Sequence, residues 1–300
     1  MRWWLWALWA VVLAAGLRYA ARFPWLDTWT TLGDADWALL AVAGGLNLLS
    51  LAVKAWAWQL LLRPLAPVRA RTAQAATFAG AAVNSIGIAM SGEAARVHLL
   101  GRWDGVSAGT ATRSIAASRL VEAAALGVFV LGVAAAVTTG HGWRLIGGAV
   151  LLLAGALALL RWTPWLRPRA GDEAGITGWT ATQLAAPLAL DVGSWGLQWA
   201  TYHWSIAATN VAVTPALSAL ALVLANVGGI FRLTPGNVGV VQGAVVLGLA
   251  PAHVPAAEAV AAGLALQAVQ VLPVLVIGLA LLGRHGMREL LRRRPAEEAA

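Results

Sequence analysis

The stretch PALSALALVLANVGGIFRLTPGNVGVVQGAVVLGLA, residues Pro215–Ala250, decides the fold. It is apolar enough for a membrane, but Gly228-Gly229 and the segment 232–237 interrupt it near the middle. Proline lacks the N–H that continues a helix and glycine tolerates the turn, so two half-helices should meet at Pro235-Gly236. Broken backbone survives at membrane depth only where it is buried in protein or lines a wet cavity. We therefore predict a re-entrant helical hairpin over about 214–250.

A second stretch earlier in the chain has the same character. Residues Thr72–Gly92, TAQAATFAGAAVNSIGIAMSG, carry no charge, yet Gly80, Gly87 and several polar side chains break up the apolar pattern. We expect a second re-entrant hairpin over about 72–98.

The composition places both hairpins in an integral membrane protein. Of 300 residues, 60% are hydrophobic and only 11% are charged, whereas a soluble domain carries about a quarter charged residues. A membrane helix needs about 20 mostly apolar residues. The stretches that meet this requirement are Trp3–Tyr19, Trp37–Leu62, Ile115–Thr138, Trp143–Leu160, Trp179–Tyr202 and Ala259–Leu282. The predicted fold class is thus an all-α polytopic membrane protein with about six full spans plus the two hairpins.

The first span has an alternative interpretation as a cleaved signal peptide. No small-x-small cleavage site follows it cleanly, because Arg18 and Arg22 flank the one candidate, and this favours a retained anchor. The 17 Trp residues are expected to lie mostly at the membrane interfaces.

The net charge of +8 predicts topology rather than a nucleic-acid partner. It comes from 21 basic and 13 acidic residues, and the Arg residues are scattered singly between apolar stretches, whereas a nucleic-acid surface would cluster them on one polar face. The chain has no cysteine, and its five His lie far apart in sequence, so we expect no metal site and no cofactor.

Positive residues mark the cytoplasmic side of a membrane protein. Arg63, Arg69 and Arg71 precede the first hairpin, and Arg96, Arg102 and Arg113 follow it. Because both clusters belong on one side, the first hairpin should not cross. The same rule places both termini in the cytoplasm and the protein in the cell (inner) membrane.

This orientation exposes an inverted repeat. Residues 1–140 give two spans, a hairpin from the inside and a span, and residues 141–284 give the same order with the hairpin entering from the outside, before a basic tail at 285–300. Inverted repeats with discontinuous helices are typical of transporters. The alternative is a set of eight irregular helices without a repeat.

Five charges lie inside or at the edge of the predicted membrane elements: Lys54, Arg119, Glu122, Asp191 and Arg232. Arg119 and Glu122 are three apart on one helix and should pair, either to orient that helix or to line a headgroup path. Asp191 is interpreted either as a coupling residue or as the partner of Arg232. Lys54 precedes Trp56 and Trp58, a pattern typical of interfacial snorkelling.

Polar residues lie within the two predicted hairpins and the last predicted span. The exposed N–H groups at half-helix N-termini attract anions such as phosphate; the alternative is that Gly, Ser and Pro allow close packing while Glu93 caps a helix. The predicted translocation residues are Asn84, Ser85, Glu93, Arg96, Arg119, Glu122, Asp191, Asn226, Arg232, Thr234, Pro235, Gly236, Gly239, Gln242, Gln267 and Gln270.

Three motifs in this sequence resemble the flippase-like membrane family typified by the transmembrane region of lysylphosphatidylglycerol synthase/flippase. They are NSIGIAMSGEAARVHLL (Asn84–Leu100), SRLVEAAA (Ser118–Ala125) and LTPGNVGVVQGAVVL (Leu233–Leu247). The resemblance, which runs end to end, implies a lipid-translocating membrane unit; some related members are implicated in moving polyprenyl-linked sugars or hopanoids. The first hairpin departs from the family in lacking its usual Pro, and Gln242 stands where the family has an acid.

We therefore expect a flippase that moves an amphipathic, anionic lipid or a lipid-linked glycan between leaflets. Its expected partners are membrane lipids and not nucleic acid, and a homo-oligomer is left open. No lysyl-transfer domain follows Arg294, and an enzymatic role is not expected. Two alternatives remain, an embedded enzyme using Glu93 and Asp104 and a scaffold that recruits enzymes through its basic tail.

Overall fold

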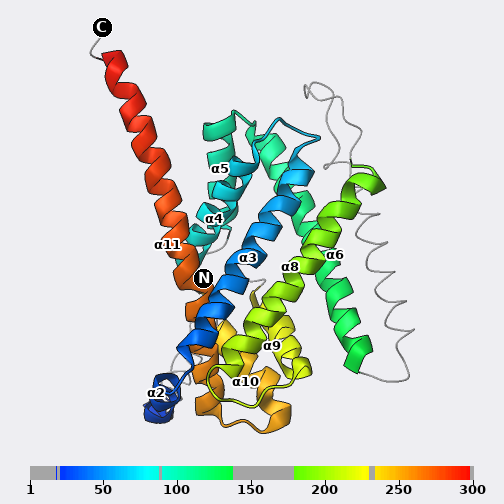
Figure 1. Cartoon of the computed structure of the whole chain (residues 1–300), viewed down its shortest axis with the longest axis vertical. Helices are drawn as coiled ribbons and strands as arrows, with labels where there is room; N and C mark the ends of the chain where they lie inside the picture. The colour runs from blue at the N-terminus through cyan, green and yellow to red at the C-terminus, as the bar shows by residue number, and fades with distance from the viewer. Residues whose placement is uncertain (1–17, 19–20, 88–89, 138–178, 230–233, 298–300) are drawn as a thin grey trace, which may run out of the picture.

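The computed structural model describes residues 18, 21–87, 90–137, 179–229 and 234–297, and within these ranges the secondary structure is helical without strands (Figure 1). The helices are α2 (Trp25–Gly33), α3 (Trp37–Leu62), α4 (Ala70–Ile86), α5 (Ser91–Asp104), α6 (Ala108–Val137), α8 (Ala181–Ala207), α9 (Pro215–Gly228), α10 (Val240–Leu249) and α11 (Ala256–Glu297). The predicted spans Trp3–Tyr19 and Trp143–Leu160 lie outside the described residues, apart from Arg18.

The long helices α3 and α8 pack side by side at the centre of the molecule and run in opposite directions (Figure 1). Small polar residues allow this close contact: the Ser50 hydroxyl donates to the carbonyl of Ser194 across the interface at 3.0 Å. The ends of α3 agree with the predicted span, and Asp36 caps its N-terminus by accepting from two backbone N–H groups.

Two helical hairpins occupy opposite ends of this central pair (Figure 1). The α4–α5 hairpin breaks at residues 87–90, and the α9–α10 hairpin breaks between residues 229 and 239. Their tips meet: a Cβ added at Gly236 would lie 2.7 Å from the carbonyl oxygen of Ser85. Both breaks lie where glycine, proline and polar residues predicted them, and Gly236 takes the left-handed backbone conformation (φ 60°) at the Pro-Gly turn.

Helices α6 and α11 complete the described bundle, and both extend beyond the predicted spans. Helix α6 begins at Ala108 rather than Ile115, and α11 continues to Glu297, so the residues predicted as a separate basic tail from 285 onward prolong the last span. Leu, Arg and Glu are good helix formers, which explains why the helix does not stop where its apolar pattern does.

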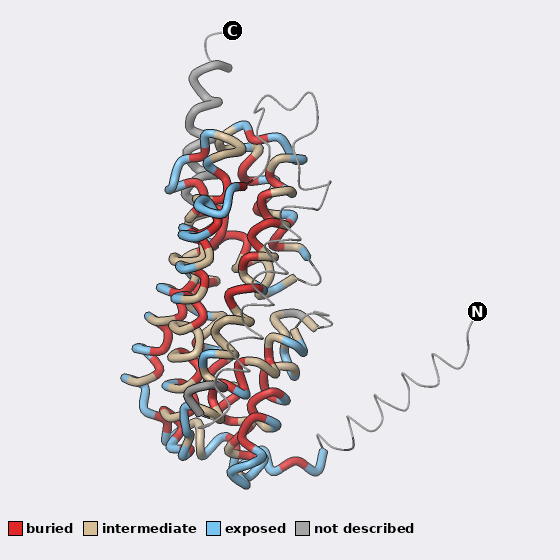
Figure 2. Tube along the Cα trace, turned by 90° about the vertical axis from the view of Figure 1, so that its right-hand side faces the viewer, coloured by how far each residue is buried: buried red, intermediate tan, exposed pale blue. Residues whose placement is uncertain are grey.

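Three of the described helices contain segments both long and apolar enough to cross a membrane: Trp37–Leu62, Ala108–Val133 and Ala256–Gly283. Helix α8 has 27 residues, about 40 Å at 1.5 Å per residue, but its buried polar side chains lower its hydropathy. Figure 2 shows buried residues along the inner faces of the bundle and exposed ones at its periphery and ends.

The described tryptophans divide between surface and core, whereas the sequence predicts that the 17 tryptophans lie mostly at the interfaces. Trp25, Trp29 and Trp37 are exposed near one end of α3, as an interface anchor requires. Trp58 is fully buried and donates to Ser114 at 3.2 Å, and Trp179 is buried and donates to the carbonyl of Leu61 at 3.0 Å. Their indole N–H groups are thus satisfied inside the protein.

Candidate functional site

A cavity of about 260 Å³ lies where the two hairpin tips meet. The cavity is lined from α3, α4, α8, α9, α10 and α11 and from the turn at residues 234–237. Its lining consists of Lys54, Asn84, Ser85, Gly87, Trp195, Gln198, Tyr202, Ala225, Asn226, Thr234, Gly236, Asn237, Val241, Gln270 and Val271.

The lining is polar in a chain that is 60% hydrophobic. Side-chain amides come from both hairpins, α8 and α11, and hydroxyls from Ser85, Tyr202 and Thr234. Buried polar groups cost free energy unless they are hydrogen-bonded. A lining of this kind is therefore suited to a polar ligand or to water.

Lys54 lies at this cavity, so the prediction that it snorkels to the membrane interface is wrong. Its ammonium is 4.0 Å from the centre of the Trp195 ring on α8, a cation–π contact. The helical turn explains the error: Trp58, one turn beyond Lys54, is fully buried, while Trp56 points outward. Lys54 has no hydrogen-bond or ion-pair partner among the described residues.

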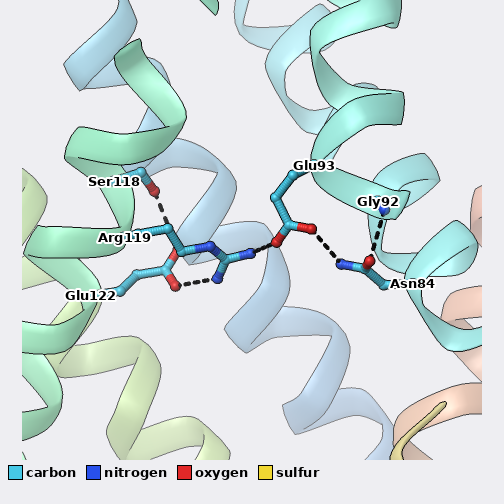
Figure 3. Close-up of polar contacts among 6 residues, drawn as sticks. All are labelled: Asn84, Gly92, Glu93, Ser118, Arg119 and Glu122. Atoms are coloured by element: carbon cyan, nitrogen blue, oxygen red, sulfur yellow. Dashed lines mark hydrogen bonds and ion pairs between the residues drawn. The ribbon is translucent and has the colours of Figure 1, made fainter. Parts of the chain in front are cut away.

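A chain of charged and polar side chains joins the first hairpin to α6 beside the cavity (Figure 3). Arg119 of α6 forms ion pairs with Glu93 of α5 and with Glu122 one turn along its own helix, the latter at 2.7 Å. Glu93 also accepts from the Asn84 amide at 3.3 Å, and Ser118 donates to Glu122 at 3.2 Å. The predicted Arg119–Glu122 pair is present, and the network extends it to the tip of the hairpin.

Two further charged residues adjoin this network. Arg96 lies over the Trp58 ring at 3.8 Å, and its buried Nε has no hydrogen-bond partner. Asp191 on α8 is 1% exposed, and its Oδ1 is also without a partner. Lys54, Glu122, Arg119 and Arg96 all interact electrostatically with Asp191. The structure therefore gathers both signs of charge between α3, α5, α6 and α8.

At each half-helix start, a side chain of the same hairpin accepts from one of the backbone N–H groups that were predicted to attract anions. At the start of α5 the N–H of Gly92 donates to the side-chain oxygen of Asn84 at 2.7 Å. At the start of α10 the N–H of Gly239 donates to Gln242 at 2.7 Å. Each hairpin tip is thus held in shape by its own amide residue, and Glu93 pairs with Arg119 instead of capping α5.

A chain of amides fixes the second tip to α11. Gln242 donates to the side-chain oxygen of Gln267 at 2.5 Å, and Gln267 donates to the carbonyl of Gly236 at 2.7 Å. Gln242 both accepts from a backbone N–H and donates to another side chain. An ionised acid at this position could not donate, so the second of these two hydrogen bonds requires the amide.

The structure thus divides the predicted site residues into groups. Asn84, Ser85, Asn226, Thr234, Gly236 and Gln270 line the cavity; Glu93, Arg96, Arg119, Glu122 and Asp191 form the adjacent charged group; and Gly239, Gln242 and Gln267 support the second tip. Arg232 lies outside the described residues, and Pro235 forms part of the turn.

Sequence reasoning missed Gln198 and Tyr202 of α8. Together with Asp191 and Trp195 they are spaced four, three and four residues apart, which places all of them on one helical face. This spacing was visible in the sequence, but nothing local showed that the polar face of α8 meets both hairpins.

The described residues contain no group of three or more His, Asp or Glu that could hold a metal ion. Glu93 and Asp104, considered as a catalytic pair, form separate ion pairs: Glu93 with Arg119, and Asp104 with Arg69 at 2.5 Å. These two carboxylates therefore do not converge on one pocket.

The model of the lysylphosphatidylglycerol synthase TM region family matches residues 5–278 of this chain. The match spans both hairpins, the cavity and the charged group. No individual curated protein matches the chain.

Proposed function

The chain belongs to the lysylphosphatidylglycerol synthase TM region family and is a multi-pass membrane protein, and from this premise we propose that it translocates an amphipathic lipid with an anionic headgroup between leaflets. The family relates the chain to lipid modification or translocation. The observation that carries the transport proposal is the meeting of two opposed hairpin tips at a polar cavity inside an apolar bundle.

Helix lengths support re-entrant hairpins. Helices α4, α5, α9 and α10 have 17, 14, 14 and 10 residues, and at 1.5 Å per residue each is shorter than the roughly 30 Å hydrocarbon core. We propose that each hairpin enters the bilayer from one side and returns to it, with the tips meeting near the midplane.

The order of the described elements supports the proposed inverted repeat. Helices α3 to α6 give a long helix, a hairpin and a long helix, and α8 to α11 give the same order with the hairpin at the other end of the molecule (Figure 1). In transporters built this way the substrate site lies between the repeats. The proposed orientation keeps both termini in the cytoplasm of a cell whose inner membrane holds the protein.

The charged group supplies the charged side chains of the proposed path. Arg119 is the partly exposed member, with 39% of its side chain accessible, while Glu93 and Glu122 are nearly buried. A guanidinium presents a fork of donors that suits phosphate. We propose that headgroups pass Arg119 and the cavity while the acyl chains remain in lipid, and that no catalytic step in this chain is required.

Reconstitution in liposomes tests this function. Purified protein should accelerate transfer of a headgroup-labelled anionic phospholipid, measured by its accessibility to a leaflet-specific quencher. Asn226→Leu, which replaces a cavity amide, should slow transfer by about fivefold, the effect of losing one neutral hydrogen bond of about 1 kcal/mol to a headgroup hydroxyl. Val227→Leu changes the neighbouring exposed residue of the same helix and should transfer at the unaltered rate.

Arg119→Gln provides a second variant in the charged group. Its transfer rate should also fall, provided that its elution in size-exclusion chromatography matches the parent protein. Equal rates for empty and protein-containing liposomes across several anionic lipids would refute transport.

A further inference from the structure

The side chains that line the central cavity indicate which class of headgroup it can bind. Among its described lining residues, Lys54 is the one charged side chain, and the polar remainder consists of amides and hydroxyls. The chemistry of this lining limits the headgroup that the proposed function can serve.

The Lys54 ammonium can bind one negatively charged group of a ligand. Its ammonium faces the cavity and has no ion-pair or hydrogen-bond partner among the described residues, while the Trp195 ring holds it from one side at 4.0 Å. Glu122 and Asp191 interact with it electrostatically without lining the cavity. An ammonium has three N–H donors, and a phosphate is the partner that would use them best.

The amides leave both donors and acceptors unused. The Ser50 hydroxyl shares its one proton between the carbonyl of Ser194 at 3.0 Å and the side-chain oxygen of Gln198 at 3.2 Å, which leaves the NH₂ group of Gln198 for the cavity. Asn226 donates to the carbonyl of Leu222 at 2.8 Å, which leaves its oxygen. A hydroxyl both donates and accepts, so a ligand with several hydroxyls matches unused atoms of both kinds.

A cationic headgroup does not fit this lining. No described cavity residue is a carboxylate, and a ligand ammonium would be repelled by Lys54. Lys54 itself covers the Trp195 ring, the face that could otherwise receive a cation. The volume of about 260 Å³ is below the roughly 300 Å³ at which pockets for drug-sized ligands begin, which limits the ligand to about one ring or one glycerol unit.

We propose that this cavity binds a headgroup consisting of one phosphate and a single neutral polyol or sugar ring, with the phosphate at Lys54 and the hydroxyls at the amides, and that it discriminates against cationic aminoacyl headgroups. The inference rests on the proposed function, because it names the substrate class for the same site. It also separates this chain from the lysyl headgroup in the name of its family.

Calorimetric binding to the detergent-purified full chain tests the inference independently of transport. The probes are short-chain forms of phosphatidylinositol, phosphatidylglycerol, glucosyldiacylglycerol and lysylphosphatidylglycerol. Phosphatidylinositol should bind at least about tenfold more tightly than lysylphosphatidylglycerol, a difference of about 1.4 kcal/mol. Equal or tighter binding of lysylphosphatidylglycerol overturns the proposal.

Lys54→Gln separates the phosphate part of the site from the polyol part. The affinity for phosphatidylinositol should fall by about tenfold or more, the effect of losing a charged hydrogen bond, while that for uncharged glucosyldiacylglycerol stays the same. Arg63→Gln removes a cation from the exposed end of the same helix and should change neither affinity. Equal losses for both lipids in Lys54→Gln would contradict a phosphate position there.

Gln198→Glu tests the discrimination by a gain. Glutamate can keep the bond from Ser50 and places a carboxylate oxygen where the amide NH₂ faces the cavity. The affinity ratio of lysylphosphatidylglycerol to phosphatidylinositol should rise by about tenfold. Gln183→Glu makes the same change at the exposed start of α8, where the side-chain oxygen accepts from the backbone N–H of Thr180. This variant should leave the affinity ratio of the two lipids unchanged.

The binding and transport outcomes are separable. Selective binding without accelerated transfer would refute the transport proposal and leave the headgroup inference standing. Accelerated transfer of lysylphosphatidylglycerol with no preference for the polyol lipid would refute the headgroup inference alone.

Discussion

Arg119 is held by carboxylates from two different helices, and this arrangement makes its energetic role measurable. Because Glu93 is nearly buried, removing Arg119 leaves a carboxylate without its ion-pair partner in a poorly hydrated place. A double-mutant cycle of Glu93→Gln and Arg119→Gln should therefore give a coupling energy of about 1–3 kcal/mol. The measurement is reversible unfolding in mixed micelles with increasing sodium dodecyl sulfate.

The Arg69–Asp104 pair provides the comparison for this cycle. Asp104 is as buried as Glu93, but Arg69 is 72% exposed against 39% for Arg119. Water and salt therefore screen the Arg69–Asp104 pair more, and its coupling energy should stay below about 1 kcal/mol. A coupling at Glu93–Arg119 no larger than at Arg69–Asp104 would show that the network does not stabilise the junction of α5 and α6.

At the scale of the element, the α9–α10 hairpin depends on one close approach between backbones. A Cβ added at Gly248 would lie within 2.8 Å of the backbone of Ala221, whereas one added at Gly243 on the same helix meets nothing within 4 Å. Gly248→Ala should destabilise the protein by about 1–3 kcal/mol through overpacking. Gly243→Ala should stabilise it by about 0.5–1 kcal/mol, because alanine favours the helix.

Thermal unfolding followed by circular dichroism checks both variants in one detergent. The two midpoints should move in opposite directions from that of the parent protein. A downward shift of similar size in both would mean that the position on α10 does not matter and that the α9–α10 contact is not tight.

The helix breaks could be predicted from the sequence, and the cavity only in part. Proline and glycine act locally, so Pro235-Gly236 and Gly87 located the tips without knowledge of the tertiary structure. The position of Lys54 depends on which face of α3 meets α8, and neighbouring tryptophans pointed to the wrong environment. Asn84 and Gln270 were predicted as site residues, yet their shared cavity follows from the meeting of hairpins distant in the chain.

At the scale of the whole molecule, the contact between the hairpin tips connects the two halves. The chain contains no cysteine, so a pair introduced by Ser85→Cys and Asn237→Cys is the sole thiol pair. Both positions line the cavity, and a Cβ at Gly236, the residue before Asn237, would lie 2.7 Å from the carbonyl oxygen of Ser85. Oxidation should therefore join the tips and arrest lipid transfer, while a reductant should restore it. Lipid transfer is measured by the rate of leaflet-specific quenching. Disulfide formation is measured by the gel mobility of the chain after cleavage between the two hairpins, because a disulfide holds the two fragments together.

Each single-cysteine variant is the control for this experiment and should transfer lipid equally under oxidising and reducing conditions. Full transfer by the cross-linked protein would mean that the tips need not separate for a headgroup to pass.

The double engagement of Arg119 has a kinetic consequence. A phosphate that reaches this guanidinium competes with Glu93 and Glu122 for its N–H donors, so part of the attraction is spent on weakening existing ion pairs. The phosphate is therefore held less tightly than it would be by an unpaired arginine. Among related complexes, a lower affinity comes mostly from faster dissociation. The residence time of the phosphate at Arg119 is therefore short. Under the proposed function, a returning carboxylate speeds departure of the phosphate, and the ion pair thereby keeps the bound headgroup from blocking the path.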